Sequence, residues 1–257
     1  MADKDKHQKQ VPDGSRRNFL KNSGLTVGGL VVGGTIAGLL GANPENNNQG
    51  VKNSETTSQG YKNPNEALMF FTPAQYQTTQ AATERIFPKD EIGPGAKELN
   101  VAIYIDHQLA SPWGINAKNY MLGPFYEPAP TQGPQLRILR KDMFRLGLQG
   151  LDDYSQKKYQ KVFTELEAEE QDEVLVDFEE GEAFQLTAGL STSVFFTILK
   201  TLTIEGVYAD PMYGGNKEMQ GWKMRNYPGT RMSYAQEIVE EKFVKLNPES
   251  LRSHMGQ

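Results

Sequence analysis

Cysteine is absent from the 257-residue chain, and histidine occurs only three times, as His7, His107 and His254. Without thiols the chain forms no disulfide, holds no iron–sulfur cluster through cysteine, and attaches no c-type haem through a C-x-x-C-H pattern. Two of the histidines lie near the ends of the sequence, so a histidine-rich metal site is not expected. We therefore expect no metal and no cofactor in this chain, and no catalytic residues of its own.

Basic charge and long apolar runs are scarce as well. Residues 1–42 hold six of the 27 basic and three of the 32 acidic residues, which leaves the remainder with a net charge near −8. Nucleic-acid binding requires a basic face that replaces counterions, so this balance argues against it. Only residues 24–42 form an apolar run close to the roughly 20 residues that a membrane span needs, and seven of them are glycine.

A complete twin-arginine export pattern, S-R-R-x-F-L-K, precedes this apolar run. Its fixed positions are Ser15, Arg16, Arg17, Phe19, Leu20 and Lys21. A basic segment followed by an apolar one is the layout of an export signal, and the twin-arginine route carries proteins that are already folded. No A-x-A triplet ends the apolar run, so residues 1–42 are either a cleaved signal or a retained membrane anchor. An ordinary anchor with a positive flank is the alternative interpretation.

Two further segments follow. Residues 43–65 are rich in Asn, Gln, Ser and Thr and nearly devoid of apolar side chains, which predicts a disordered linker. Residues 66–257 have the length of a single domain. Apolar residues at helical spacing, capping residues and Pro or Gly stops predict an all-α domain of about six helices. The expected helical ranges are 72–87, 94–110, 134–150, 154–180 and 190–209, with Leu136, Leu139, Met143 and Leu146 facing inward and Gly181 interrupting the fourth range.

Three features of this domain attract a functional interpretation. The Pro- and Gly-punctuated residues 113–133 carry Trp113, Tyr120 and Phe125, which suit a contact surface, although they suit a cap on the domain's own core equally well. Ten acidic residues and no basic one lie between 165 and 182, a pattern typical of a solvated helix face. Glu205 falls on the apolar stripe of the last long helix, so we expect it to be buried and paired or to face a partner.

A stand-alone enzyme would have to use His107 as a general base with Asp106 or Glu84, or a carboxylate pair of Glu205 and Asp210. A lone histidine beside an apolar stripe is more often structural, even though histidine is the commonest acid–base group. No nucleophile elbow, phosphate loop or dinucleotide fingerprint supports catalysis.

Several blocks of the sequence resemble one family, the small subunit (subunit 3, or gamma) of membrane-bound gluconate 2-dehydrogenase. The similarity spans about residues 70–232. Its blocks are Thr72-Pro73-Ala74, Arg85-Ile86-Phe87-Pro88-Lys89-Asp90, Gly93-Pro94-Gly95-Ala96, Asp106-His107-Gln108-Leu109-Ala110, Gly123-Pro124-Phe125, and the strongest, residues 206–216 with Gly221-Trp222-Lys223 and Tyr227-Pro228-Gly229. Val207 departs from the aromatic residue that is frequent there.

The resemblance implies an accessory subunit of an exported sugar or polyol dehydrogenase. Such a subunit pairs with a large FAD-containing subunit of the glucose–methanol–choline type, and a cytochrome c subunit with haem c often completes the complex. The small subunit carries the twin-arginine signal and exports the flavoprotein with it, to the periplasm or the extracytoplasmic face of the membrane. A membrane-anchored structural adaptor without a redox partner is the other non-enzymatic alternative.

The strongest block also predicts where the partner binds. Tyrosine and tryptophan are the residue types that anchor interfaces, and two glycines allow a tight loop. The expected interface comprises Trp113, Tyr120, Phe125, Asp210, Pro211, Tyr213, Gly214, Gly215, Asn216 and Trp222. The alternative is that the 210–216 loop only caps the last long helix within the domain itself.

Overall fold

The domain that follows the linker is built from α-helices. The computed structural model describes residues 66–126, 129, 132, 135–187, 190–239 and 244–255. Its α-helices are α2 (Pro73–Ile86), α3 (Val101–Ala110), α4 (Arg140–Tyr159), α5 (Ala168–Glu180), α6 (Thr192–Tyr208), α7 (Gln220–Met224) and α8 (Ala235–Val239). The only strands in these ranges are β1 (Gln185–Thr187) and β2 (Leu190–Ser191), a short antiparallel pair. The predicted all-α class is confirmed, with seven α-helices in place of about six.

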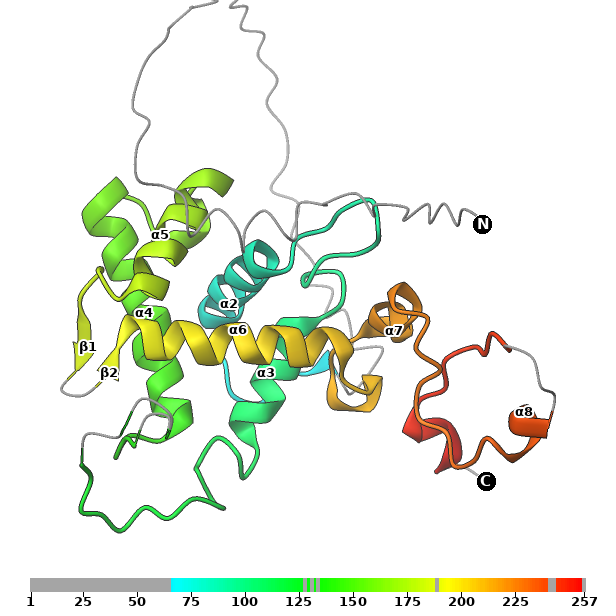
Figure 1. Cartoon of the computed structure of the whole chain (residues 1–257). Coiled ribbons are helices and arrows are strands. Elements are labelled where there is room, and N and C mark those ends of the chain that lie inside the picture. The colour runs from blue at the N-terminus through cyan, green and yellow to red at the C-terminus, as the bar shows by residue number, and fades with distance from the viewer. Residues whose placement is uncertain are drawn as a thin grey trace, which may run out of the picture.

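Helix α6 is the centre of the domain. It crosses the helical body and packs against α2, α3, α4 and α5 (Figure 1). Phe195, Phe196 and Leu199 are almost completely buried along it. The crossing with α4 is close because α4 carries Gly147, where an added Cβ would lie 2.1 Å from the Phe195 ring. This close packing fixes the position of the α6 residues that reach the surface.

Helix α2 begins as its sequence predicts. Thr72 accepts a hydrogen bond from the Gln75 backbone N–H, and the Gln75 side chain accepts one from the Thr72 backbone, which completes a capping box. Near its other end, Arg85 donates two 2.7 Å hydrogen bonds to the Asp172 carboxylate on α5. Such a bidentate pair is stronger and more directional than an ordinary surface ion pair, so it fixes α2 against α5.

None of the ten acidic residues around α5 is buried, as a solvated helix face requires, but several of them also bind other helices. Besides Asp172, Asp177 accepts a 2.8 Å hydrogen bond from Lys158 on α4, and Glu179 accepts a 2.7 Å bond from Lys200 on α6. The basic partners come from other helices, so a count of charges along the segment could not reveal them. The acids therefore connect α5 to three neighbouring helices.

Several predicted boundaries and orientations are wrong. Helix α3 begins at Val101 and not at residue 94, after Asn100 in the left-handed conformation, and α4 begins at Arg140 and not at residue 134. The expected 154–180 helix is divided: α4 ends at Tyr159, the 3₁₀ turn η2 (Phe163–Glu165) follows, and α5 ends at Gly181, the interruption that was predicted. Leu146 is 37% exposed, because the inward face of α4 is formed by Met143, Phe144, Leu148 and Leu151.

None of the helices within residues 66–255 has the length and apolar character that crossing a bilayer requires. The export pattern with Arg16 and Arg17, the apolar run 24–42 and the linker 43–65 all lie outside the residues that the structure describes.

Candidate partner-binding surface

The strongest sequence block folds into a compact structure at the end of α6, with Asn216 at its centre. Asn216 is fully buried. Its side-chain amide donates to the Ala209 carbonyl at 2.8 Å and accepts from the Gly221 backbone N–H at 2.8 Å. Next to it, Trp222 is only 5% exposed and its indole N–H donates to the Tyr208 carbonyl at 2.7 Å. These bonds fix the segment after α6 against the helix end.

Asp210 holds the C-terminal segment of the chain against this block. Its carboxylate accepts hydrogen bonds from the backbone N–H of Met212 at 3.0 Å, the Ser250 hydroxyl at 2.6 Å and the Leu251 backbone N–H at 2.7 Å. The Thr230 hydroxyl lies 3.4 Å from the same group. A carboxylate with this many local donors is engaged in holding the fold together.

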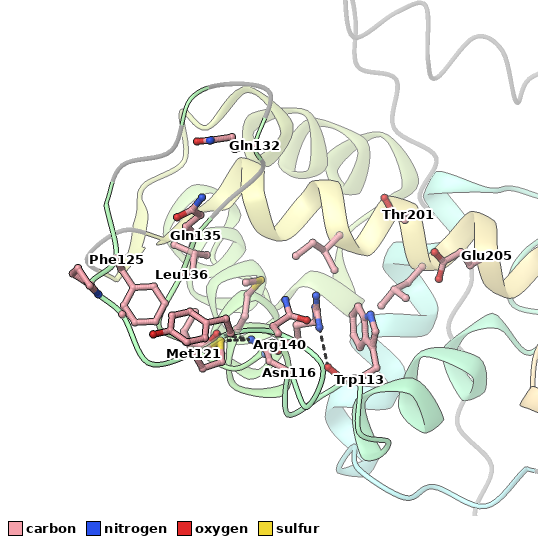
Figure 2. A pocket seen from close by; sticks show the side chains of 18 residues that line it. Trp113, Asn116, Met121, Phe125, Gln132, Gln135, Leu136, Arg140, Thr201 and Glu205 are labelled. Atoms are coloured by element: carbon pink, nitrogen blue, oxygen red, sulfur yellow. Dashed lines mark hydrogen bonds between the residues drawn. The ribbon is translucent and has the colours of Figure 1, made fainter.

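A cleft of about 760 Å³ lies beneath the aromatic loop, which comprises the described residues between 113 and 139. The start of α4 and one side of α6 form its other walls (Figure 2). Trp113, Phe125 and Arg140 line it, together with Thr201 and Glu205 from α6. Its volume falls in the range of ordinary ligand sites, although it is open along the protein surface.

The base of the aromatic loop is firmly held. The buried Asn116 accepts a 3.2 Å hydrogen bond from the Arg140 backbone N–H, and Lys141 donates its backbone N–H to Gly114 at 3.0 Å. The Arg140 guanidinium donates to the Trp113 carbonyl at 3.2 Å and lies 4.6 Å from the centre of the Trp113 ring. This cation–π contact keeps both side chains at the floor of the cleft.

A second hollow, of about 490 Å³, adjoins the cleft through Glu205, which lines both. Tyr104, Asp210 and Tyr213 line it as well. The Tyr104 hydroxyl donates to Glu205 at 3.2 Å. Burial, and after it the negative charge of Glu205, raise the pKa of Tyr104. Glu205 is exposed, which excludes the buried alternative of the expectation, and it lies between the two hollows.

The side chains that a stand-alone enzyme would use are engaged with the backbone. Asp106 is fully buried and accepts the backbone N–H groups of Met69, Phe70 and Phe71. His107 contacts the Ala67 carbonyl at 3.0 Å. Glu84 accepts the backbone N–H groups of residues 89 and 97. These three groups hold the start of the domain and the turn before α3, and none of them lines the two hollows, whereas the alternative carboxylate pair, Glu205 and Asp210, lines the second hollow.

The predicted interface residues divide into an outer and an inner set. Tyr120 is 77% exposed and Tyr213 is 47% exposed, while Trp113, Phe125, Asp210 and Pro211 are partly exposed. Gly214, Gly215, Asn216 and Trp222 are buried. Of the outer set, Trp113, Tyr120 and Phe125 line the cleft, and Asp210 and Tyr213 line the second hollow, whereas the inner set lines neither.

Sequence reasoning missed Arg140, Asn116, Tyr104 and Thr201. Arg140 and Asn116 are 24 residues apart, and Tyr104 and Glu205 are 101 apart. Local spacing carries no signal for such pairs. Charge does not single out the cleft either, since residues 113–141 and residues 217–231 each hold four basic residues and one acid.

Within the described residues, no group of three or more His, Asp or Glu side chains could hold a metal ion. The fold and the site together define a small helical domain whose surface carries exposed aromatic side chains beside two hollows. The family model for gluconate 2-dehydrogenase subunit 3 matches residues 73–229, and the chain belongs to this family. Searches of curated proteins and of solved structures returned no match. Family membership makes the chain a subunit of a gluconate 2-dehydrogenase-type complex.

Proposed function

We propose that this chain is the accessory small subunit of an exported FAD-dependent sugar or polyol dehydrogenase. It binds a large flavoprotein subunit of the glucose–methanol–choline type, stabilises it and carries it through the twin-arginine route to the extracytoplasmic side of the membrane. FAD belongs to the large subunit in this proposal, and haem c to a third subunit where one is present. The small subunit contributes binding surface and the export signal.

One observation carries the non-catalytic part of the proposal. The histidine-centred candidates for acid–base chemistry, Asp106, His107 and Glu84, each hold a backbone group in the fold. In the alternative carboxylate pair, Asp210 accepts two backbone N–H groups. A general base must reach a substrate proton, and a carboxylate that accepts three backbone N–H groups within the core is not placed to do so. The exposed aromatic side chains, by contrast, are of the type that anchors interfaces.

The full aromatic surface extends from the cleft, through Glu205, to the second hollow at Tyr213. Large apolar side chains protrude around the aromatic loop: Ile115 is 49% exposed, Leu122 is 85% exposed and Tyr126 is 72% exposed. Clustered apolar groups of this size favour a protein partner over bulk water. The buried set around Asn216 and Trp222 supports this surface from below, so changes there alter the fold before they alter binding.

Tyr213 and Trp222 give a test of this division. We expect Tyr213→Ala to weaken flavoprotein binding by about 2 kcal/mol with an unchanged melting temperature, because the ring lies on the surface and truncation of an interface tyrosine costs that much. Trp222→Phe should instead lower the unfolding free energy by about 1–2 kcal/mol, because it removes the bond to Tyr208 and shrinks a buried side chain. Binding is measured by co-purification and melting by circular dichroism.

The matched control for Tyr213 is Tyr227→Ala, since Tyr227 is similarly exposed, at 49%, but lines neither hollow. It does contact the Trp222 ring, so its melting temperature is recorded as well. A fall in melting temperature for Tyr213→Ala with full binding would assign the 210–216 loop to the fold alone.

A further inference from the structure

The cleft beneath the aromatic loop contains a cation, Arg140, that has no anionic partner among the described residues. Arg140 uses one guanidinium nitrogen to bind the Trp113 carbonyl, and its guanidinium carbon lies 4.6 Å from the centre of the Trp113 ring. Among the residues that the structure describes, no carboxylate forms an ion pair with it. A guanidinium presents five N–H donors in a rigid fork that matches a carboxylate. Arg140 is therefore positioned and partly desolvated, with donors remaining for an acid from outside the chain.

The segment that carries Arg140 is locally basic. The residues after the first 42 carry a net charge near −8, yet residues 113–141 hold four basic residues and one acid. Of these four, only Arg140 lines the cleft, and a cation in this position orients a partner of opposite charge. Among the described residues that line the cleft, the one carboxylate is Glu205, which lies on α6 beside Thr201 (Figure 2).

We propose that the cleft binds a protruding segment of the large flavoprotein subunit, and that an acidic side chain of this segment pairs with Arg140. The inference rests on the proposed function, because it takes the large subunit as the occupant. Trp113 and Phe125 contact the apolar part of the segment. Glu205 repels acids, so the acidic residue of the segment lies at the Arg140 side.

Shape and charge favour a protein segment over a lipid surface. A bilayer contacts parts of a protein that protrude, whereas the cleft is concave and is enclosed by the loop, α4 and α6. An anionic headgroup at the cleft would also meet the exposed Glu205 carboxylate. A peptide segment can match the charge at both sides of the cleft, with an acid toward Arg140 and a neutral or basic group toward Glu205.

Filling the cleft is the first test. Thr201 is exposed on α6 and lines the cleft, so Thr201→Tyr adds a ring to this wall and leaves the identity of Arg140 unchanged. Thr197→Tyr is the matched control, because Thr197 is exposed one turn earlier on the same helix and lies outside the cleft. We expect Thr201→Tyr to weaken the affinity for the purified flavoprotein about tenfold or more. The control should change it by less than about threefold.

Removing the cation is the second test. Arg140→Gln should weaken binding about 10- to 100-fold and reduce its dependence on salt, as expected for the loss of a desolvated ion pair. Arg137→Gln is the control, because Arg137 is exposed in the same basic segment but does not line the cleft. Affinities are measured by isothermal titration calorimetry, with melting temperatures recorded for every variant. If Arg140→Gln lowers the melting temperature, its affinity is not interpreted, and the comparison of Thr201→Tyr with Thr197→Tyr tests the proposal.

The outcomes separate this inference from the function on which it rests. If the unaltered chain does not bind the flavoprotein, the proposed function fails. If it binds, and Thr201→Tyr and Arg140→Gln bind as tightly as their controls, the cleft inference fails and the function stands. Loss of a homodimer, or of binding to phosphatidylglycerol vesicles, with flavoprotein binding intact would also overturn the inference, because another occupant would then use the cleft.

Discussion

Replacing Asp106 by alanine is expected to lower the free energy of unfolding by about 4 kcal/mol. The side chain is fully buried on α3 and accepts hydrogen bonds from three consecutive backbone N–H groups, at 2.6 Å from Met69, 3.0 Å from Phe70 and 2.6 Å from Phe71. Alanine would leave these donors without an acceptor in a site that excludes water. The total free energy of unfolding of such a domain is only about 5–15 kcal/mol. The variant should therefore be close to the limit at which the domain unfolds.

Denaturant unfolding measures this effect, with Asp153→Ala as the control. Asp153 is exposed on α4 and bonds only to the Gln149 side chain, so its loss should cost less than about 0.5 kcal/mol. The loss of unfolding free energy for Asp106→Asn should lie between those of Asp106→Ala and Asp153→Ala, because an amide keeps one acceptor oxygen. If Asp106→Ala has the same free energy of unfolding as Asp153→Ala, the structural role given to the Asp106 carboxylate is wrong, and a catalytic role has to be considered again.

Changing Arg16 and Arg17 together to lysine is expected to abolish export almost completely, for this chain and for its flavoprotein partner. The double change keeps the positive charge and removes only the twin-arginine pattern, so an ordinary anchor with a positive flank would tolerate it. Cell fractionation with antibodies against both proteins measures the outcome. The control changes Lys6 and Lys9 to arginine, which keeps charge outside the pattern and should leave export intact.

Two results would contradict this expectation. If the small subunit still crosses the membrane, the twin-arginine assignment fails and the segment acts as an anchor of another kind. If the small subunit stays in the cytoplasm while the flavoprotein reaches the far side, the flavoprotein has its own export route and the escort role is wrong.

Local signals predicted the parts of the fold that depend on neighbouring residues. Thr72, Pro73 and Gln75 specify the start of α2, and Gly181 specifies the end of α5 in a left-handed conformation. The apolar stripe of α6 predicted both ends of that helix to within two residues. In each case a cap or a periodic pattern carries the information within one or two helical turns.

Long-range contacts decide what local signals could not. Residues 94–100 have helical spacing, yet they form turns, because Glu84 accepts the backbone N–H groups of residues 89 and 97 and Gly95 packs against Glu84. The face that α4 turns inward depends on the Gly147 contact with Phe195 of α6, and this leaves Leu146 outside.

The candidate surface shows the same limit. The sequence identified Trp113, Tyr120, Phe125 and Tyr213, because aromatic residues in irregular segments are conspicuous. It did not indicate that the first three line a single cleft with Arg140, or that Glu205 joins this cleft to Tyr213. Those relations arise from the packing of the aromatic loop on α4 and α6.

Affinity purification of the tagged small subunit from detergent-solubilised membranes tests the central claim most directly. The account predicts that a flavoprotein of the glucose–methanol–choline type co-purifies in a fixed ratio, and that all flavin absorbance and dehydrogenase turnover stay with it when the subunits are separated. The isolated small subunit should be colourless and inactive. Stoichiometric flavin or turnover in the isolated small subunit, or a pure small subunit with no flavoprotein attached, would contradict the account.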